Sequence, residues 1–464
     1  MDQTGQGMDE AAYGTTGKAE GAALRLPLAG ERQPARGRRW RLPLAALALV
    51  AGAPAAQAYS AFAADSPHLF GDWGGQRTAL EAAGVSFDFD YVGEAATILD
   101  GGYRDSHVTK YADQFALGAN LDLERLLGIP DAEFQVTLTD RNGHSVNDRL
   151  SDPGATVGGS SVQEVQGRGP VTRLTQFWYR QRFFDDALSI KLGRIPFGDD
   201  FATIDSHFQN LAFGGAQPGN WGNDIYNWPI SQWAAVVRAN LAADWYLQAG
   251  VFNLNDSNLD NDHGLDLHHS GTQGTMYPIE LGYTPTIGGM AGTYKLGFYT
   301  HDVDNRAYGD GPATRTSDTN TGLYYVIQQR VTTHGGDAKR GLTLFSMGNT
   351  NHGDTAGIDR YVSICATYQG PFNARPQDDA GIGLAYLHVN DDVNDYIDYY
   401  NATPAGSLTP LPRQGHEYDA ELYYSVNLTP YLTLRPNLQY VANPSAVDSV
   451  DNAWVLGTTV QVSF

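Results

Sequence analysis

The sequence is poor in cysteine and in long apolar runs. Cys365 is the single cysteine among 464 residues, so no disulfide can form within the chain. After the first 60 positions there is no run of 18 or more apolar residues, which is the minimum for a membrane-spanning helix. The mean hydropathy is -0.36. These absences exclude a disulfide-stapled fold and a helical membrane protein.

Basic residues are also scarce. Lys and Arg number 30 against 52 Asp and Glu, which gives a formal net charge of -22. Nucleic acids and anionic lipid surfaces require a basic face, so neither is expected as a partner. The chain is instead rich in Tyr (26) and Gly (53). Tyrosine favours strands and membrane–water boundaries.

The N-terminal 58 residues are predicted to be a leader. A basic stretch, ERQPARGRRWR (31–41), precedes the apolar LPLAALALVAGAPA (42–55), and small-residue cleavage sites follow at AQA (56–58) and AFA (61–63). This order is typical of a secretory signal peptide, cleaved at 58 or as late as 64. The first 30 residues are unusual for such a signal, and an N-terminal anchor helix is the alternative interpretation. The predicted organisation is a leader (1–58), a periplasmic segment (59–84) and a barrel (85–464).

From Val85 onward the sequence resolves into sixteen short alternating runs separated by Gly, Asn, Asp and Pro. Roughly ten residues per run fit a tilted membrane strand, and bacterial barrels have even strand numbers. The connections alternate between short and long, as periplasmic turns and external loops do. The predicted strands are 85–98, 112–126, 132–143, 172–184, 187–196, 231–242, 245–254, 276–285, 292–302, 321–332, 341–350, 360–370, 380–390, 416–429, 431–443 and 453–464.

The two faces of the predicted strands differ in polarity. In 416–429, Glu417, Asp419 and Glu421 alternate with apolar or aromatic residues. A soluble sandwich strand exposed to solvent gives the same pattern. The absence of intervening helices, the aromatic strand ends and the leader favour a closed barrel, whose last strand, ending at Phe464, lies in the membrane. The predicted fold is therefore all-β: a 16-stranded antiparallel transmembrane barrel of the outer-membrane porin type.

One segment before the barrel departs from the strand pattern. Residues 76–83 are predicted to form a short periplasmic helix at the barrel mouth, and Gly84 suits its C-terminal cap, where a positive φ is needed. The long stretches 144–171 and 197–230 are typical of loops that fold into the lumen and narrow it.

Several motifs resemble the carbohydrate-selective porins of the OprB family. They are LFGDWGGQRTALEAAGVSFDFDYVGEAA (69–96), YADQFALGANLDLERLLG (111–128), LTDRNGHS (138–145), QFWYRQRF (176–183), IKLGRIPFGDDFA (190–202), NWGNDIYNWPISQWAAVVRAN (220–240) and the terminal TTVQVSF. The similarity runs from about 69 to 464. It implies a sixteen-stranded barrel in the Gram-negative outer membrane that passes sugars, glucose above all, by facilitated diffusion.

The residues themselves suggest how sugars would be recognised. A sugar needs donors, acceptors and aromatic surface at a narrow waist. Arg–carboxylate pairs can present spare N–H groups and oxygens to hydroxyls, and indole rings can stack on C–H faces. The strand phase and the loop motif predict the following substrate-binding residues: Glu94, Arg141, Lys191, Arg194, Trp221, Trp228, Arg238 and Arg435.

The alternatives to a sugar-selective porin are of two kinds. A general or other-solute porin uses the same barrel, and an outer-membrane enzyme or an adhesin is a different class. The chain has no Gly-x-Ser-x-Gly elbow for an enzyme nucleophile. It also shows no nucleotide motif, so transport is expected to be downhill. The expected partners are small neutral sugars and outer-membrane lipid but no nucleic acid, and a homotrimer is one candidate assembly.

The stretch NDSNLDNDHGLDLHH (255–269) alternates acidic residues with histidines close by. An EF-hand loop would place Gly at position 261 and Glu at 267, and this chain has Asn261 and Leu267 there. A solvated external loop is therefore the preferred interpretation. No cofactor and no metal are predicted.

Overall fold

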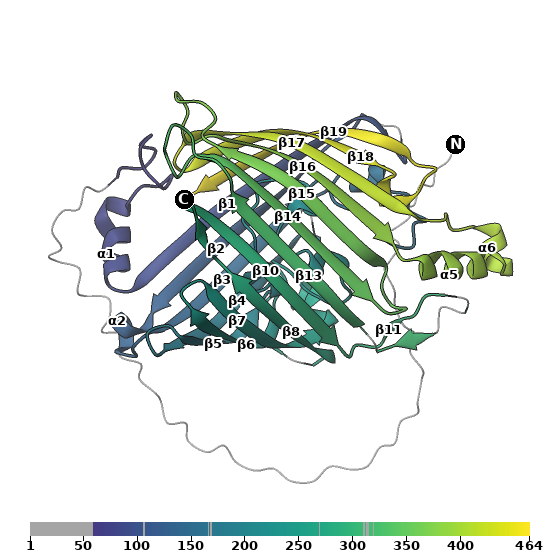
Figure 1. Cartoon of the computed structure of the whole chain (residues 1–464), viewed down its shortest axis with the longest axis horizontal. Helices are drawn as coiled ribbons and strands as arrows, with labels where there is room; N and C mark the ends of the chain where they lie inside the picture. Colours follow the sequence, from purple (N-terminus) through teal and green to yellow (C-terminus); the bar gives the residue numbers. More distant parts are fainter. Residues whose placement is uncertain are drawn as a thin grey trace, which may run out of the picture. The chain divides into compact units, whose positions relative to one another are not determined.

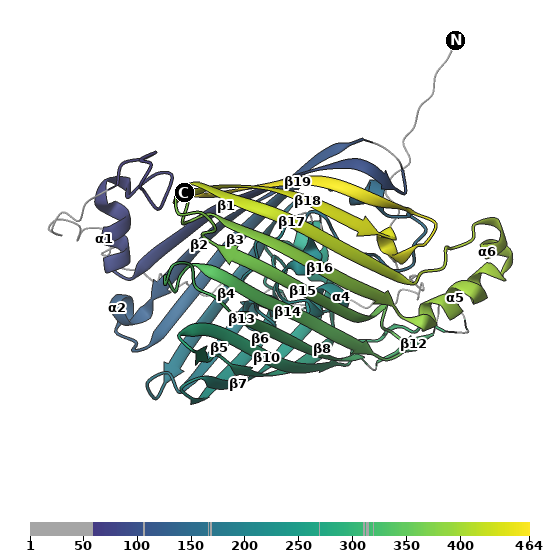
Figure 2. The same cartoon turned by 45° about the horizontal axis from the view of Figure 1, so that its top comes forward.

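The computed structural model describes residues 59–464 apart from 105–106, 166, 168, 269, 310, 312–314 and 319. The predicted leader, 1–58, lies outside the described residues. Among the described residues, sixteen long antiparallel strands follow one another around a closed barrel, because β19 pairs with both β18 and β1 (Figures 1 and 2).

The predicted fold and all sixteen strands are confirmed. The observed wall strands are β1 (Val85–Gly102), β2 (Thr109–Asp122), β3 (Ala132–Gly143), β4 (Val171–Phe183), β5 (Leu188–Ile195), β6 (Gln232–Ala242), β7 (Trp245–Asn255), β8 (Thr272–Tyr283), β10 (Met290–His301), β13 (Asn320–Arg330), β14 (Gly341–His352), β15 (Ile358–Gln369), β16 (Asp379–Val389), β17 (His416–Thr429), β18 (Leu432–Ala442) and β19 (Asp451–Ser463).

Short elements complete the fold. Three two-residue strands, which the sequence patterns did not indicate, are β9 (Thr286–Ile287), β11 (Asn305–Arg306) and β12 (Thr316–Ser317). The α-helices are α1 (Gln76–Ala82), α2 (Leu123–Leu127), α3 (Asn147–Leu150), α4 (Pro218–Trp221), α5 (Asp391–Asn401) and α6 (Pro404–Leu408).

The strand predicted for 112–126 ends earlier, at Asp122. The Asp122 carboxylate accepts hydrogen bonds from the backbone N–H groups of Glu124 and Arg125 and so caps α2, which the apolar alternation had concealed. The predicted helix over 76–83 is confirmed as α1, and Gly84 takes a φ of 97°.

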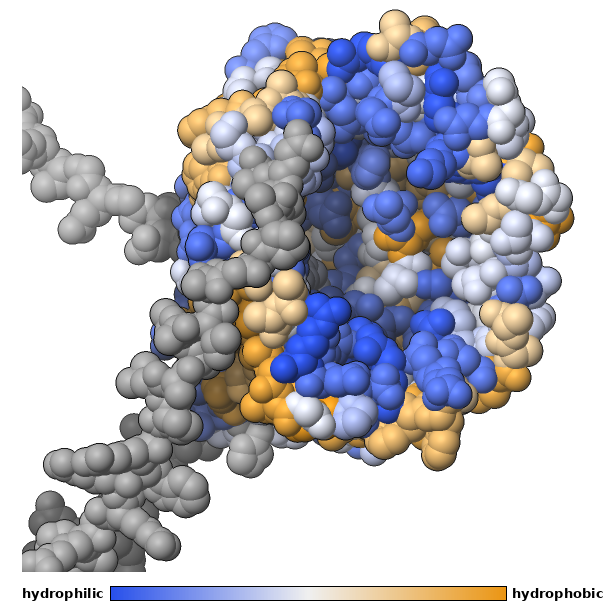
Figure 3. All heavy atoms as spheres, turned by 90° about the vertical axis from the view of Figure 1, so that its left-hand side faces the viewer, coloured by the Kyte–Doolittle hydropathy of each residue, from blue (hydrophilic) through white to orange (hydrophobic). Residues whose placement is uncertain are grey.

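The alternation of β17 shows how the wall is built. Glu417, Asp419 and Glu421 are buried and face the lumen, whereas Tyr418 and Leu422 are exposed on the outside. This is the polarity of a wall with lipid outside and polar groups inside. Seen from the end that carries α1 and α2, the barrel is hollow with a largely hydrophilic interior, and hydrophobic residues lie at its outer edges (Figure 3).

The two ends of the barrel differ. The short turns, α1 and Phe464 lie at one end, and the long loops with α5 and α6 lie at the other (Figure 1). Short turns are periplasmic in bacterial barrels. We therefore call the end with α1 the periplasmic end and the other the extracellular end.

Candidate functional site

Two long connections between wall strands fold into the barrel: loop A (144–170) joins β3 to β4, and loop B (196–231) joins β5 to β6. They also bind each other. The backbone N–H of Leu211 in loop B donates to the carbonyl of Ser161 at 2.8 Å, and the N–H of Glu164 in loop A donates to Gln209 at 3.0 Å. The two loops thus form one structure inside the wall. Their length had predicted that they fold inward, but not that they bind each other.

Buried wall carboxylates hold loop A. The backbone N–H of Val165 donates to the Glu94 carboxylate at 3.0 Å, and the N–H of Ser160 donates to Glu417 at 2.6 Å. The hydroxyl of Ser160 donates to Asp419 at 2.6 Å. All three side chains are buried, so these hydrogen bonds fix loop A against the wall.

Loop B is held in the same way and also by apolar packing. The N–H groups of Gln209 and Asn210 donate to the two oxygens of Glu421 at 2.9 and 2.8 Å. The N–H of Ala202 donates to Glu280 at 2.8 Å. Aromatic side chains of loop B pack against inward wall residues in the largest buried cluster; those under 2% exposed are Phe197, Phe201 and Phe213.

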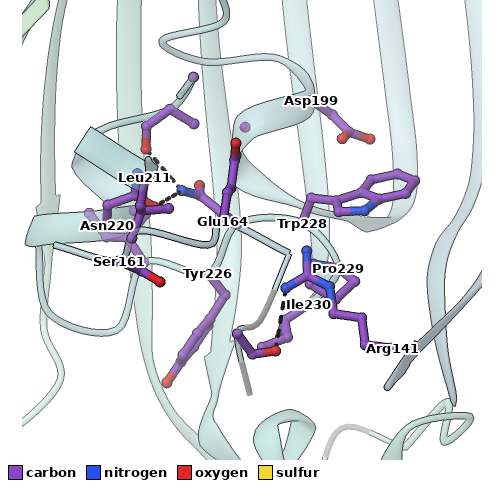
Figure 4. A pocket seen from close by; sticks show the side chains of 17 residues that line it. Arg141, Ser161, Glu164, Asp199, Leu211, Asn220, Tyr226, Trp228, Pro229 and Ile230 are labelled. Carbon is purple, nitrogen blue, oxygen red and sulfur yellow. Dashed lines mark hydrogen bonds between the residues drawn. The ribbon is translucent and has the colours of Figure 1, made fainter. Parts of the chain in front are cut away.

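A cavity of about 370 Å³ lies where the two loops face the wall (Figure 4). Its polar and aromatic lining comes from three elements. Strand β3 supplies Arg141, loop A supplies Ser161 and Glu164, and loop B supplies Asp199, Asn220, Tyr226, Asn227 and Trp228.

Gln114 on β2 joins two of these groups. Its side-chain oxygen accepts from Arg141 Nε at 2.8 Å and from Trp228 Nε1 at 3.0 Å. Arg141 Nη1 also donates to the carbonyl of Gly167 at 3.3 Å. The guanidinium and the indole are therefore fixed relative to each other at the edge of the cavity.

Two loop carboxyls give the cavity its acidic side. Burial raises the pKa of Glu164 to about 7, against the opposing effect of the Arg141 charge. Burial likewise raises the pKa of Asp199 to about 6, against the charge of Lys191. Asp199 also accepts a hydrogen bond from Gln176 Nε2 at 2.6 Å. The cavity therefore presents a cationic donor and two ionisable acceptors.

Of the predicted substrate-binding residues, the structure brings Arg141 and Trp228 together at the cavity. Glu94 holds loop A, and Lys191 pairs with Asp200 of loop B at 2.9 Å. Trp221 is buried within loop B, where its indole N–H donates to Gln217 at 2.5 Å. Glu94, Lys191 and Trp221 therefore stabilise the positions of the loops and do not line the cavity.

The remaining arginines lie elsewhere. Arg435 donates to the Ser425 hydroxyl at 2.7 Å and to Gln461 at 3.0 Å, within the wall. Arg238 lies in a separate recess formed by periplasmic turns. Neither lines the cavity between the loops.

The expectation that Arg194 faces the lumen is wrong. Lys191 contacts loop B, and Leu192 is exposed on the outside; Arg194, two residues after Leu192, shares that outer face. Its guanidinium donates to the carbonyls of Asp266 and Ser231 at 2.7 and 2.8 Å. It therefore supports the loops at the end of the strand.

Sequence reasoning missed Gln114, Glu164, Asp199, Asn220 and Tyr226. Gln114 was detectable, because it lies in phase with the polar face of a predicted strand. The others lie in loops, where no periodicity assigns a direction to a side chain.

The acidic stretch at 255–269 places Asp260, Asp262 and His263 close enough to offer ligand atoms to one ion. The two aspartates are exposed and His263 is partly exposed. Exposed acidic groups are common without an ion, and the solvated loop stays a prediction.

Within the part of the chain that the structure describes, no helix has the length and apolar character needed to cross a membrane.

Comparison with known proteins places the chain in a family. A model of the carbohydrate-selective porin, OprB family, matches residues 106–464. The chain is 47% identical over 436 residues to Porin B of Pseudomonas aeruginosa, covering 88% of this chain and 94% of that protein. It is 35% identical over 432 residues to the putative porin QuiX of Acinetobacter baylyi, covering 90% and 98%.

A solved structure of a porin also matches this chain. The high-pH structure of OprB from Pseudomonas putida superposes with a TM-score of 0.84 at 45% identity, covering 87% of this chain and 100% of that one. The closed wall, the inward loops and these relatives lead to one conclusion. The chain belongs to the carbohydrate-selective porin family, OprB, and is a porin of the Gram-negative outer membrane.

Proposed function

We propose that this porin passes small neutral sugars, glucose and similar saccharides, down their concentration gradient, and that the cavity between loops A and B selects them. The observation that carries the proposal is the composition of that cavity. It combines a guanidinium from β3, carboxyls from loops A and B, and two side-chain amides and two aromatic rings from loop B.

Such a lining suits a sugar better than an ion or an apolar solute. Each sugar hydroxyl both donates and accepts, so it can accept from Arg141 and donate to Glu164 or Asp199. The side-chain amides of Asn220 and Asn227 can both donate and accept hydrogen bonds. The ring of Trp228 offers a surface for the C–H face of a pyranose. The volume lies at the lower end of the range for small-molecule sites, roughly 300–1,000 Å³.

The wall charges play a second part in this proposal. Glu94 and Lys191 of the wall, together with Trp221 inside loop B, support the loops, so they influence the sugar by setting the position of the cavity. Arg435 bonds to other wall residues. This modifies the expectation that each of them touches substrate. Family membership supports a channel over an enzyme, and we propose no catalytic role.

The test is single-channel recording of the purified protein in planar bilayers, with glucose titrated against a size-matched neutral amino acid. We expect current block by glucose and none by the amino acid. Trp228→Ala and Arg141→Gln should each raise the half-blocking glucose concentration about 5- to 10-fold, because a stacking contact or a hydrogen bond to a charged group contributes about 1–1.5 kcal/mol.

Asp262→Asn is the matched control, because the Asp262 side chain is 85% exposed in an external loop. It should leave the block unchanged. Large current steps that glucose does not reduce would support the alternative of a general diffusion porin.

A further inference from the structure

A second recess lies at the periplasmic end of the barrel, separate from the cavity between the loops. It has a volume of about 400 Å³. Its lining includes residues 185–187 and 242–244, which we call the rim, and Arg238, Asn240 and Tyr246. None of its lining residues belongs to the cavity between loops A and B.

Tyr246 forms a rigid platform in this recess. Its hydroxyl donates to the fully buried Glu280 at 2.7 Å, and only 4% of the residue is exposed. Its ring lies against Gly282 on the neighbouring strand, where an added Cβ would fall 2.0 Å from a ring carbon. Because the wall offers no room behind the ring, its orientation is fixed.

Arg238 stacks on this platform. Its guanidinium carbon lies 3.7 Å from the centroid of the Tyr246 ring. Its Nε donates to the side-chain oxygen of Asn240 at 3.3 Å, and Asn240 in turn donates to the carbonyl of Asp186 at 2.6 Å. The plane of the guanidinium is therefore held by contacts on its face and on one edge.

The two terminal nitrogens of Arg238 have no acceptor among the residues that the structure describes. The arginines at 194 and 435, in contrast, use terminal nitrogens to bind protein groups. A planar pair of parallel N–H groups matches two neighbouring oxygens of a ligand. The exposed carboxylates of Asp185 and Asp244 lie in the lining of the same recess and supply acceptors.

We propose that this recess is a second, exit-side binding site for sugars. The Arg238 fork donates to two adjacent hydroxyl oxygens, and those hydroxyls donate to the rim carboxylates. A vicinal diol can do both, whereas an anion would be repelled by Asp185 and Asp244. The inference rests on the proposed function, because it assumes that sugar reaches the periplasmic end.

A local probe tests this site independently of the current. Ala243→Cys places a thiol in the exposed rim turn, and an environment-sensitive fluorophore can be attached there, because the native Cys365 is 1% exposed. Glucose should change the fluorescence saturably. Adding Arg238→Ala should raise the half-saturating concentration at least 10-fold, whereas adding Arg141→Gln should leave it unchanged.

Arg238→Lys provides the second variant. It keeps the charge beside Tyr246 but loses the planar fork, so we expect binding nearly as weak as in Arg238→Ala in a barrel that still folds. An equimolar neutral amino acid controls for osmolality. The exit-site proposal is overturned if the fluorescence of the label does not change with glucose. It is also overturned if the wild type and the Arg238 variants bind glucose with equal affinity.

The two measurements distinguish failure of the cavity proposal from failure of the exit-site proposal. If glucose blocks the current but does not affect the rim label, the cavity site stands and the exit site is wrong. If the rim label responds and depends on Arg238 while the current shows no block, the exit site stands and selection between loops A and B is wrong.

Discussion

Glu421 shows what an inward carboxylate does in this barrel. Both of its oxygens accept backbone N–H groups from loop B, more than 200 residues away in sequence. Glu417 on the same strand accepts the backbone N–H of Ser160 in loop A, and Asp419 accepts the Ser160 hydroxyl. A buried backbone N–H that loses its acceptor costs about 1–3 kcal/mol, so these side chains determine where the loops lie.

We expect Glu421→Gln to loosen loop B. The amide oxygen of Gln can still accept one N–H, but its NH₂ group faces the other, so one buried donor loses its partner. Single-channel recordings should show a larger mean conductance and stronger current fluctuations than in the wild type. Unchanged conductance in a folded variant would contradict the anchoring role, and Asp262→Asn again serves as the control.

Neighbouring strands fit together through pairs of inward tyrosine and glycine. Tyr324 on β13 lies directly opposite Gly297 on β10, and Tyr299 on β10 lies opposite Gly322 on β13. An added Cβ at Gly297 would fall 2.0 Å from the Tyr324 ring. The absent side chain thus makes room for the ring to lie flat on the wall.

Gly297→Ala is therefore expected to destabilise the β10–β13 pair by about 1–3 kcal/mol, the usual effect of overpacking. The measurement is the temperature at which the folded band disappears on semi-native gels. Gly415→Ala is the control, because nothing lies within 4 Å of the added atom. A variant as heat-resistant as the control would show that the ring moves aside without cost.

The segment before β1 closes the periplasmic end of the β1–β19 seam. The N–H of Leu69 donates to the carbonyl of Ser463 at 2.8 Å. Arg77, which is 4% exposed, donates to the carbonyls of Phe87 and Phe464. The ring of Phe464 stacks on Phe89 with their centroids 4.5 Å apart. The first and last strands are thus joined by this segment as well as by their ladder.

Arg77→Ala should lower the free energy of unfolding by about 2–3 kcal/mol, because two partly buried main-chain oxygens lose a charged donor. Urea unfolding followed by tryptophan fluorescence measures the change. Arg413→Ala removes an ion pair whose two side chains are 63% and 55% exposed, so its effect should be close to zero. Equal midpoints for the two variants would argue against the seam role.

At the scale of the whole molecule, closure satisfies the backbone of every wall strand. Sixteen strands paired in a ring leave no edge, which is a condition for a sheet that faces lipid. The lumen can then carry charge, since it is lined by polar side chains and loops. We therefore expect the charges of the cavity to influence which ions cross the barrel.

The ion selectivity of the channel should change with pH. The cavity carboxyls have raised pKa values, about 7 for Glu164 and about 6 for Asp199. Both are neutral at pH 5, which leaves the Arg141 charge in excess, and both are ionised at pH 8. The reversal potential in a salt gradient should therefore shift toward cation selectivity between pH 5 and pH 8.

Glu164→Gln should remove the upper part of this shift, near pH 7, and Asp199→Asn the lower part, near pH 6. Identical reversal potentials at the two pH values in the wild type would show that charges elsewhere in the lumen dominate.

The sequence by itself determined the wall. Period-two alternation is a local property, so sixteen strands, the polar face containing Glu417, Asp419 and Glu421, and the helix before Gly84 could be predicted without knowledge of distant contacts. The same rule placed Arg141 inward. It was misapplied at Arg194, which lies an odd number of residues from Lys191 and therefore on the other face.

Only the tertiary structure decided what the inward groups do. Ser160 and Glu417 are 257 residues apart in sequence, and no local pattern predicts that one binds the other. The folding of loops A and B into the lumen pairs Glu94 and Arg141 with backbone groups of loop A and Lys191 with Asp200 of loop B. It also brings Glu164, Asp199 and Trp228 to Arg141. Periodicity assigns a side chain to a face, but its partner depends on where the loops fold.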